Sequence, residues 1–120
     1  MRFHVLTLFP DAFRGHLEYS MLALALQRGL VSIDVTDIRD YSHDPHNTAD
    51  DYQFGGGRGM VMKPQPVFEA TKAALSGYSE SNRAEIPIVL FTPQGEMLTQ
   101  QVVKELSLAP AVAMICAHYA

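Results

Sequence analysis

The residues with the clearest chemical potential form one run, Asp50 to Met62, which combines an acidic pair, four glycines and an arginine. Glycine accepts positive φ and carries no Cβ, so successive N–H groups can converge on an anion, or a flat ligand can lie against the backbone. Arg58 adds a planar donor fork suited to a phosphate or a nucleobase edge. Asp50 and Asp51 can accept hydrogen bonds from a base or a ribose. The run therefore predicts a nucleotide- or phosphate-binding loop, and a plain glycine hairpin tip is the alternative.

Two familiar phosphate-binding motifs are absent from this run. No Gly-Lys-Ser/Thr follows the glycines, so it is not a Walker loop, and no strand leads directly into it, so it is not a dinucleotide fingerprint. The wider segment from Arg39 to Met62 is polar and has neither a helical nor a strand period. A link of this length inside a compact domain is commonly a binding loop.

The same segment carries two histidines, His43 and His46, at H-x-x-H spacing. A metal site would need further ligands, and no second pair lies nearby in the sequence. Histidines that order the loop are the simpler interpretation. A contact from His46 to a substrate is the sharper alternative.

Hydrophobic patterning predicts the elements that must position this loop. Apolar or alternating runs indicate strands at 1–8, 30–38, 86–92 and 111–117. Helices are expected after Pro10, over 21–28 with Ser20 as N-cap and Gly29 as its end, from Pro64 to near Gly77, and over 98–107. The polar stretch 76–85 is expected to be a surface loop and the likeliest site of disorder.

This order of elements predicts an α/β domain with a mostly parallel sheet and helices on both faces. The continuous apolar run at 86–92 is typical of a parallel strand that is buried on both faces. Ligands of such sheets bind at the carboxyl ends of strands. Two candidate loops follow strands, at 92–95 and at 117–120, and each could also be an ordinary turn.

Composition limits the class of protein. The chain has 120 residues, 48% of them hydrophobic, and a formal net charge of −4, which indicates one globular domain. The acidic balance argues against this segment as the main phosphate-binding face for nucleic acid. The lone Cys116 fits a reducing compartment, and no signal peptide or membrane span is visible, so we expect a cytoplasmic protein.

Taken together, these segments resemble the bacterial tRNA (guanine-N1)-methyltransferases, the TrmD family of the knotted SPOUT superfamily. The match follows family order and spacing along the whole chain, and the glycine run with its acidic pair is the most specific part. The segments that carry the resemblance are Leu8-Phe9-Pro10-Asp11-x-Phe13, Ala25-x-x-x-Gly29-Leu30, Ile38-Arg39-Asp40-Tyr41-Ser42-x-Asp44-x-His46, Asp50-Asp51, Phe54-Gly55-Gly56-Gly57-x-Gly59-Met60-Val61-Met62, Pro93-Gln94-Gly95 and Cys116-x-His118-Tyr119.

The resemblance implies transfer of the methyl group of S-adenosylmethionine to N1 of the guanine just 3′ of the tRNA anticodon (position 37). It also implies a homodimer with the cofactor in a trefoil knot, and Mg²⁺ assistance is possible. The cofactor-binding positions that it implies are Leu90, Phe91, Thr92, Pro93, Gln94, Ala117 and Tyr119. The positions near the target guanine are His46, Asp50, Gly57, Arg58, Gly59 and Met60.

Two departures qualify the resemblance. The family closes this region with Cys-Gly-basic-Tyr-Glu-Gly, whereas Ala117 and Ala120 stand here for the first glycine and the glutamate. We also expect residues 1–120 to be the N-terminal part of the methyltransferase domain, without the knot-closing segment, the catalytic aspartate or the C-terminal tRNA-binding domain. On this view no catalytic residue is assigned, and the chain alone is expected to be inactive. The alternatives are a dimerisation module without catalysis and a nucleotide- or phosphate-binding module that uses the Gly55–Gly59 loop.

Overall fold

The structure is a computed structural model that describes residues 1–43, 50–52 and 60–116. At 50–52, 60 and 61 it describes the backbone alone. The remaining residues, 44–49, 53–59 and 117–120, lie outside this description.

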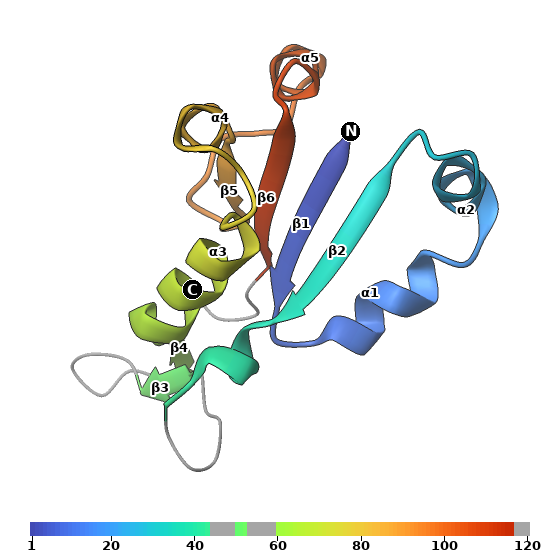
Figure 1. Cartoon of the computed structure of the whole chain (residues 1–120). Coiled ribbons are helices and arrows are strands. Elements are labelled where there is room, and N and C mark those ends of the chain that lie inside the picture. The colour runs from blue at the N-terminus through green and yellow to red at the C-terminus, as the bar shows by residue number, and fades with distance from the viewer. Residues whose placement is uncertain (44–49, 53–59, 117–120) are drawn as a thin grey trace.

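Four parallel strands form the main sheet, in the order β2-β1-β6-β5 (Figure 1). Their bounds are β1 Arg2–Thr7, β2 Ser32–Asp37, β5 Ile88–Leu90 and β6 Ala111–Cys116. Parallel strands cannot be joined by a tight hairpin turn and need a longer crossover connection. The helices between the strands provide these connections. The expectation of an α/β domain with a mostly parallel sheet is confirmed.

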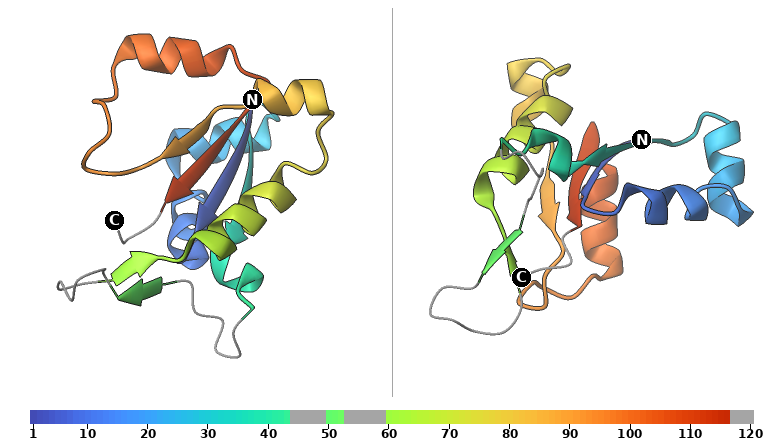
Figure 2. Two further views of the ribbon diagram at one scale, coloured as in Figure 1. Left: turned by 90° about the vertical axis from the view of Figure 1, so that its left-hand side faces the viewer. Right: turned by 90° about the horizontal axis from the view of Figure 1, so that it is seen from below.

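The core lies on the two central strands, β1 and β6. Leu6 and Ala113 are fully buried on one face, where α3 (Pro64–Ala74) packs. On the opposite face Val5 and Val112 are each 2% exposed, so this face is covered as well. Figure 2 shows α3 and α4 (Glu80–Ala84) on one side of the sheet and α1 (Pro10–His16) and α5 (Gln100–Ser107) on the other. The central strands are therefore sandwiched between helices, as expected.

Helix α2 (Ser20–Gln27) ends as the sequence predicts. Gly29 has a φ of 71°, and the Leu30 and Gly29 amides donate to the carbonyls of Ala25 and Leu26. This pair of hydrogen bonds is a Schellman motif, whose C′ position favours glycine because of its left-handed backbone. The start of the helix was predicted wrongly. The N-cap is Tyr19, and Ser20 begins the helix with a φ of 66°.

The stretch 76–85 is not the disordered surface loop that its polarity suggested. It contains helix α4 (Glu80–Ala84), which begins after Ser79, and the Ser79 hydroxyl accepts a hydrogen bond from the Asn82 amide at 3.2 Å. A polar five-residue helix has no apolar stripe to reveal it, so its cap was the only available signal.

The described residues between Arg39 and Met62 also form more regular structure than predicted. The 3₁₀ helix η1 (Ile38–Tyr41) begins it, and the short strands β3 (Asp50–Tyr52) and β4 (Met60–Met62) pair antiparallel with Asp50 opposite Met62. Asp37 starts η1 by accepting a 2.9 Å hydrogen bond from the Arg39 amide. Strands β3 and β4 are thus the two arms of a hairpin.

The apolar run at 86–92 forms a shorter strand than expected, and it is not buried on both faces. Only Ile88–Leu90 is a strand, and it lies at the edge of the sheet beside β6. Ile88 is 53% and Leu90 56% exposed. Hydrophobic composition predicted the strand correctly, but the covering layer is missing from the described part of the chain.

Candidate functional site

The carboxyl ends of β5 and β6 lie side by side and form the centre of the candidate site. Leu90 is the register partner of Ile115, and the Phe91 amide donates to the Ile115 carbonyl at 3.2 Å. The chain then leaves β6 after Cys116, immediately before position 117. The chain therefore leaves two neighbouring strands at the same carboxyl end of the sheet, which is the usual ligand position in such folds.

A tight turn follows β5 and fixes the direction of the chain there. The Gly95 amide donates to the Thr92 carbonyl at 3.1 Å, which places Pro93 at the second position of the turn, where its fixed φ is favoured. The Thr92 hydroxyl donates to Oε1 of Gln94 at 2.6 Å. A Cβ at Gly95 would lie 3.3 Å from the Thr92 carbonyl oxygen, so the small residue fits this close approach.

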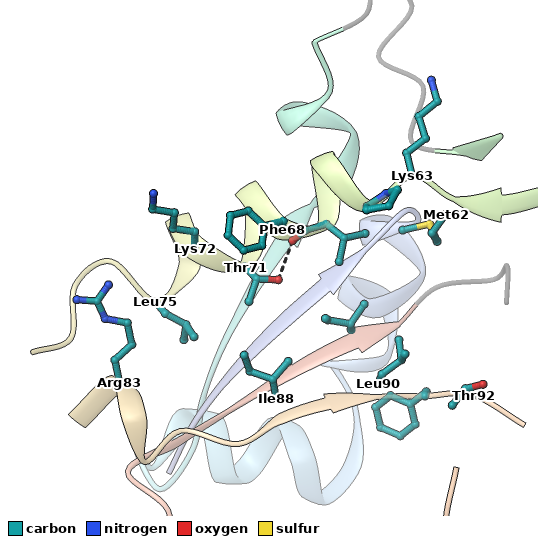
Figure 3. Close-up of a pocket in the computed structure, with 14 residues that line it drawn as sticks. Met62, Lys63, Phe68, Thr71, Lys72, Leu75, Arg83, Ile88, Leu90 and Thr92 are labelled. Atoms are coloured by element: carbon teal, nitrogen blue, oxygen red, sulfur yellow. Dashed lines mark hydrogen bonds between the residues drawn. The ribbon is translucent and has the colours of Figure 1, made fainter. Parts of the chain in front are cut away.

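A groove of about 830 Å³ opens between α3 and β5, beside this turn (Figure 3). Its walls are mainly apolar, and Lys63, Lys72 and Arg83 add positive charge. The lining residues are Met62, Lys63, Pro64, Val67, Phe68, Thr71, Lys72, Leu75, Arg83, Ile88, Leu90, Phe91, Thr92 and Ile115.

The end of strand β4 and the predicted cofactor turn border the same end of this groove. Figure 3 shows Met62 and Lys63 at the same end as Leu90 and Thr92, whereas Leu75 and Arg83 lie at the other end. Met62 is the last residue of β4, the strand that also carries Met60. The hairpin next to the glycine run and the predicted cofactor turn therefore approach each other, although they are far apart in the sequence.

Helix α3 supplies the opposite wall of the groove, which the sequence analysis did not assign to a site. Its lining residues Pro64, Val67, Phe68, Thr71 and Leu75 recur at helical spacing. The other face of the helix carries Pro66 and Ala70, both buried. The apolar residues of this helix thus form two faces, one in the core and one in the groove. The sequence analysis predicted a single apolar stripe.

The structure describes some of the predicted site residues and not others. Leu90, Phe91 and Thr92 line the groove, and Pro93 and Gln94 form the turn beside it. For Asp50 and Met60 the backbone is placed on the paired strands β3 and β4. The predicted residues that lie outside the described part of the chain are His46, Gly57, Arg58, Gly59, Ala117 and Tyr119.

The H-x-x-H pattern is described at His43 alone. Nε2 of His43 lies 3.0 Å from both carboxylate oxygens of Glu69 on α3, as expected for a histidine that orders a loop. Within residues 1–43, 50–52 and 60–116 there is no group of three or more His, Cys, Asp or Glu side chains arranged to hold a metal ion.

Two ionisable groups near the site have shifted pKa values. Burial raises the pKa of the Cys116 thiol, so it stays protonated at neutral pH and is a poor nucleophile. The hydrogen bond to His43 lowers the pKa of Glu69 most, and the bond from Gln65 adds to it, so this carboxylate stays ionised. Neither group has the properties of a base poised near neutral pH.

Comparison with known proteins identifies the family of this site. The sequence profile described as "tRNA (Guanine-1)-methyltransferase TrmD" matches residues 1–120. The chain belongs to the TrmD family of tRNA (guanine-1)-methyltransferases. Among curated relatives, the tRNA (guanine-N(1)-)-methyltransferases of Clostridioides difficile and Chloroflexus aurantiacus are 36% and 46% identical, each over 119 residues and 99% of this chain.

A solved structure of the TrmD family shares the fold. The crystal structure of tRNA (m1G37) methyltransferase from Aquifex aeolicus matches 97% of this chain with a TM-score of 0.80 and 34% identity. The chain spans about half the length of these relatives: 50% of the C. difficile protein, 46% of the C. aurantiacus protein and 50% of the A. aeolicus chain. In the portion of the chain that the structure covers, none of the helices is both long enough and apolar enough to cross a membrane.

Proposed function

We propose that the protein containing this chain methylates N1 of the guanine at position 37 of tRNA, beside the anticodon, with S-adenosylmethionine as the donor. The observation that carries the proposal is the family match along residues 1–120. The geometry supports it, because the predicted cofactor turn lies at the carboxyl ends of adjacent strands and near the hairpin of the predicted guanine-binding segment.

The exposed end of β5 fits one side of a cofactor. Leu90 and Phe91 are 56% and 52% exposed, so they offer an apolar surface to a purine ring, and Pro93 and Gln94 hold the turn that borders it. The family resemblance assigns Ala117 and Tyr119, which follow β6 in the sequence, to the second wall. When bound, S-adenosylmethionine supplies an electrophilic methyl group.

The guanine would be held by the segment around β3 and β4. Its N1 carries a proton, which must leave as the new N1–carbon bond forms, so the reaction needs a base. In our assignment His46, Asp50, Arg58 and Met60 orient the ring together with the backbone of Gly57 and Gly59, and none of these residues is assigned as the base. From the family resemblance we also propose that Mg²⁺ assists the reaction.

The chain of 120 residues should bind the cofactor weakly and transfer no methyl group by itself. A well-bound small ligand has about 70–90% of its surface buried, and the open wall at Leu90 and Phe91 covers one side. We expect a millimolar or weaker dissociation constant for S-adenosylmethionine, a binding free energy of about −4 kcal/mol or less favourable. Calorimetric titration measures this directly. Micromolar affinity would mean that the described wall carries most of the affinity or that a second chain completes the site.

We further propose a cytoplasmic homodimer. Large apolar side chains are exposed on α2 as well as in the groove, with Met21 83% and Leu24 45% exposed. Large hydrophobic faces are typical of obligate dimer interfaces. A monomer in light scattering at micromolar concentration would count against the dimer.

The decisive experiment uses the protein expressed from its complete gene. It should transfer labelled methyl groups to a tRNA transcript with guanine at position 37 and not to the same transcript with adenine there, and nuclease digestion should yield 1-methylguanosine. No transfer to the guanine transcript would refute the proposed function. A nucleotide- or phosphate-binding role of the Gly55–Gly59 loop would then be the reading to test.

A further inference from the structure

Helix α3 anchors the predicted guanine-binding segment at both ends. At the exit, β4 ends at Met62 and α3 begins two residues later at Pro64. At the entry, η1 packs against the same helix, with Ile38 fully buried and Tyr41 packed against the core. The chain between these anchors includes every residue assigned above to guanine binding.

Two side chains on the first turns of α3 make the entry anchor. Nε2 of Gln65 donates to the Tyr41 carbonyl and to Oε2 of Glu69, both at 2.7 Å. An amide nitrogen has two protons, so both bonds form at once. Gln65 and Glu69 are four residues apart and therefore share one face of the helix. Glu69 in turn holds His43 at 3.0 Å.

This cluster contributes little to the stability of the fold. The side chains of His43 and Glu69 are 74% and 40% exposed, and ion pairs between exposed side chains are screened by solvent and stabilise a fold only slightly. Its local effect is more specific, because it fixes a main-chain carbonyl and a side chain within three residues. The carboxylate stays ionised, since the hydrogen bond to His43 and that from Gln65 lower the pKa of Glu69.

We propose that Gln65 and Glu69 are positioning residues for tRNA binding. They fix the backbone from Tyr41 to His43, and thereby the point from which the guanine-binding segment leaves the fold. They touch neither substrate nor cofactor in this assignment, which rests on the proposed function. Losing the cluster should weaken the capture of tRNA and leave the cofactor turn after β5 unaffected.

Helix α5 offers a matched control. Nε2 of Gln101 donates to Oε1 of Glu105 at 3.3 Å, so the same two residue types form the same i,i+4 pair on another exposed helix face. Each variant on α3 therefore has a counterpart: Gln65→Ala with Gln101→Ala, and Glu69→Ala with Glu105→Ala.

The test uses the protein expressed from its complete gene and separates the kinetic constants for the two substrates. We expect Gln65→Ala and Glu69→Ala to raise KM for tRNA roughly tenfold, because small displacements of a positioning group are costly, with KM for S-adenosylmethionine unchanged. Glu69→Gln keeps an acceptor oxygen and should restore most of the tRNA affinity. The α5 variants should match the unmodified protein in both constants.

Hydrogen exchange supplies a readout that does not depend on activity. Peptides that cover residues 38–43 should exchange faster in Glu69→Ala than in Glu105→Ala, because the Ser42 amide in the turn donates to the Arg39 carbonyl. Unchanged exchange, or an unchanged KM for tRNA in an active protein, would overturn the positioning role. Failure of the unmodified protein to methylate tRNA would instead refute the proposed function.

Discussion

Strands β5 and β6 are neighbours with similar apolar sequences, yet they differ sharply in burial. Leu90 on β5 is 56% exposed, whereas its register partner Ile115 on β6 is 8% exposed. Ile88 and its partner Ala113 repeat the contrast at 53% and 0%. Composition alone does not distinguish the two strands, so the difference must come from their neighbours.

Those neighbours follow from the order of the sheet. β6 lies between β1 and β5, whereas β5 pairs with β6 alone in the described structure. Helix α3 contacts β1 and β2 and leaves the groove open on the side of β5. An apolar run thus indicates that a strand is suited to burial. How far its side chains are actually buried depends on the neighbouring strands and helices. The exposed strand is the one that borders the candidate cofactor site.

The largest expected effect is on the buried strand. Ile115→Ala removes a side chain from the core and should lower the free energy of unfolding by about 2–5 kcal/mol. Leu90→Ala, the neighbour in register, should cost about 0.5 kcal/mol or less, as usual for exposed positions. Urea unfolding of the 120-residue chain, followed by circular dichroism, measures both. Equal losses would contradict the comparison and show that β5 is covered in solution, and a dependence on protein concentration would identify a second copy as the cover.

The sequence predicted the central architecture because period and polarity report on it directly. The alternation of Val31, Ile33 and Val35 gave β2, and Gly29 gave the end of α2. The length of β5 and its exposure could not be predicted, because they depend on strand order. The hairpin at 50–62 was missed because three-residue strands are too short to show a period of two. The groove was missed because it forms between α3 and β5, and their relative position in space cannot be predicted from the sequence pattern.

The buried centre also contains a polar cluster whose loss should have an intermediate effect. His4 on β1 is 5% exposed, and its Nε2 lies 2.7 Å from the Tyr78 hydroxyl. Nδ1 of His4 lies 3.7 Å from Oδ2 of Asp34, which favours the tautomer with its proton on Nδ1, and in that tautomer Nε2 accepts from the Tyr78 hydroxyl. Tyr78→Phe leaves this buried nitrogen without its donor and should lower the free energy of unfolding by roughly 1–3 kcal/mol. A loss as small as that of Leu90→Ala would show that this part of the sheet is as tolerant as the edge.

The same histidine should make stability depend on pH. Burial lowers the pKa of His4 below its ordinary value, with Asp34 opposing the shift and Arg2 adding to it. The unfolded chain then binds the proton more readily, so this stabilisation is present above about pH 6.5 and is lost as the pH falls through the lower folded pKa. Between about pH 7.5 and about pH 5.5 the unmodified chain should lose more stability than His4→Gln. Parallel pH dependences in the two chains would contradict this sign.

The smallest effect tests whether exposure alone makes a position tolerant, as the comparison of β5 with β6 would suggest. Gly29 and Gly15 are both exposed, and a Cβ added at either would meet no atom within 4 Å. Gly29 has a φ of 71°, which costs an L-residue about 1 kcal/mol, whereas Gly15 lies in helix α1, where alanine is preferred. Gly29→Ala should therefore destabilise the chain by about 1 kcal/mol, and Gly15→Ala should stabilise it by roughly 0.5–1 kcal/mol. Thermal unfolding of both variants measures the difference in sign, which steric packing cannot produce at two open positions. If both variants unfolded like the unmodified chain, the left-handed turn after α2 would not hold in solution.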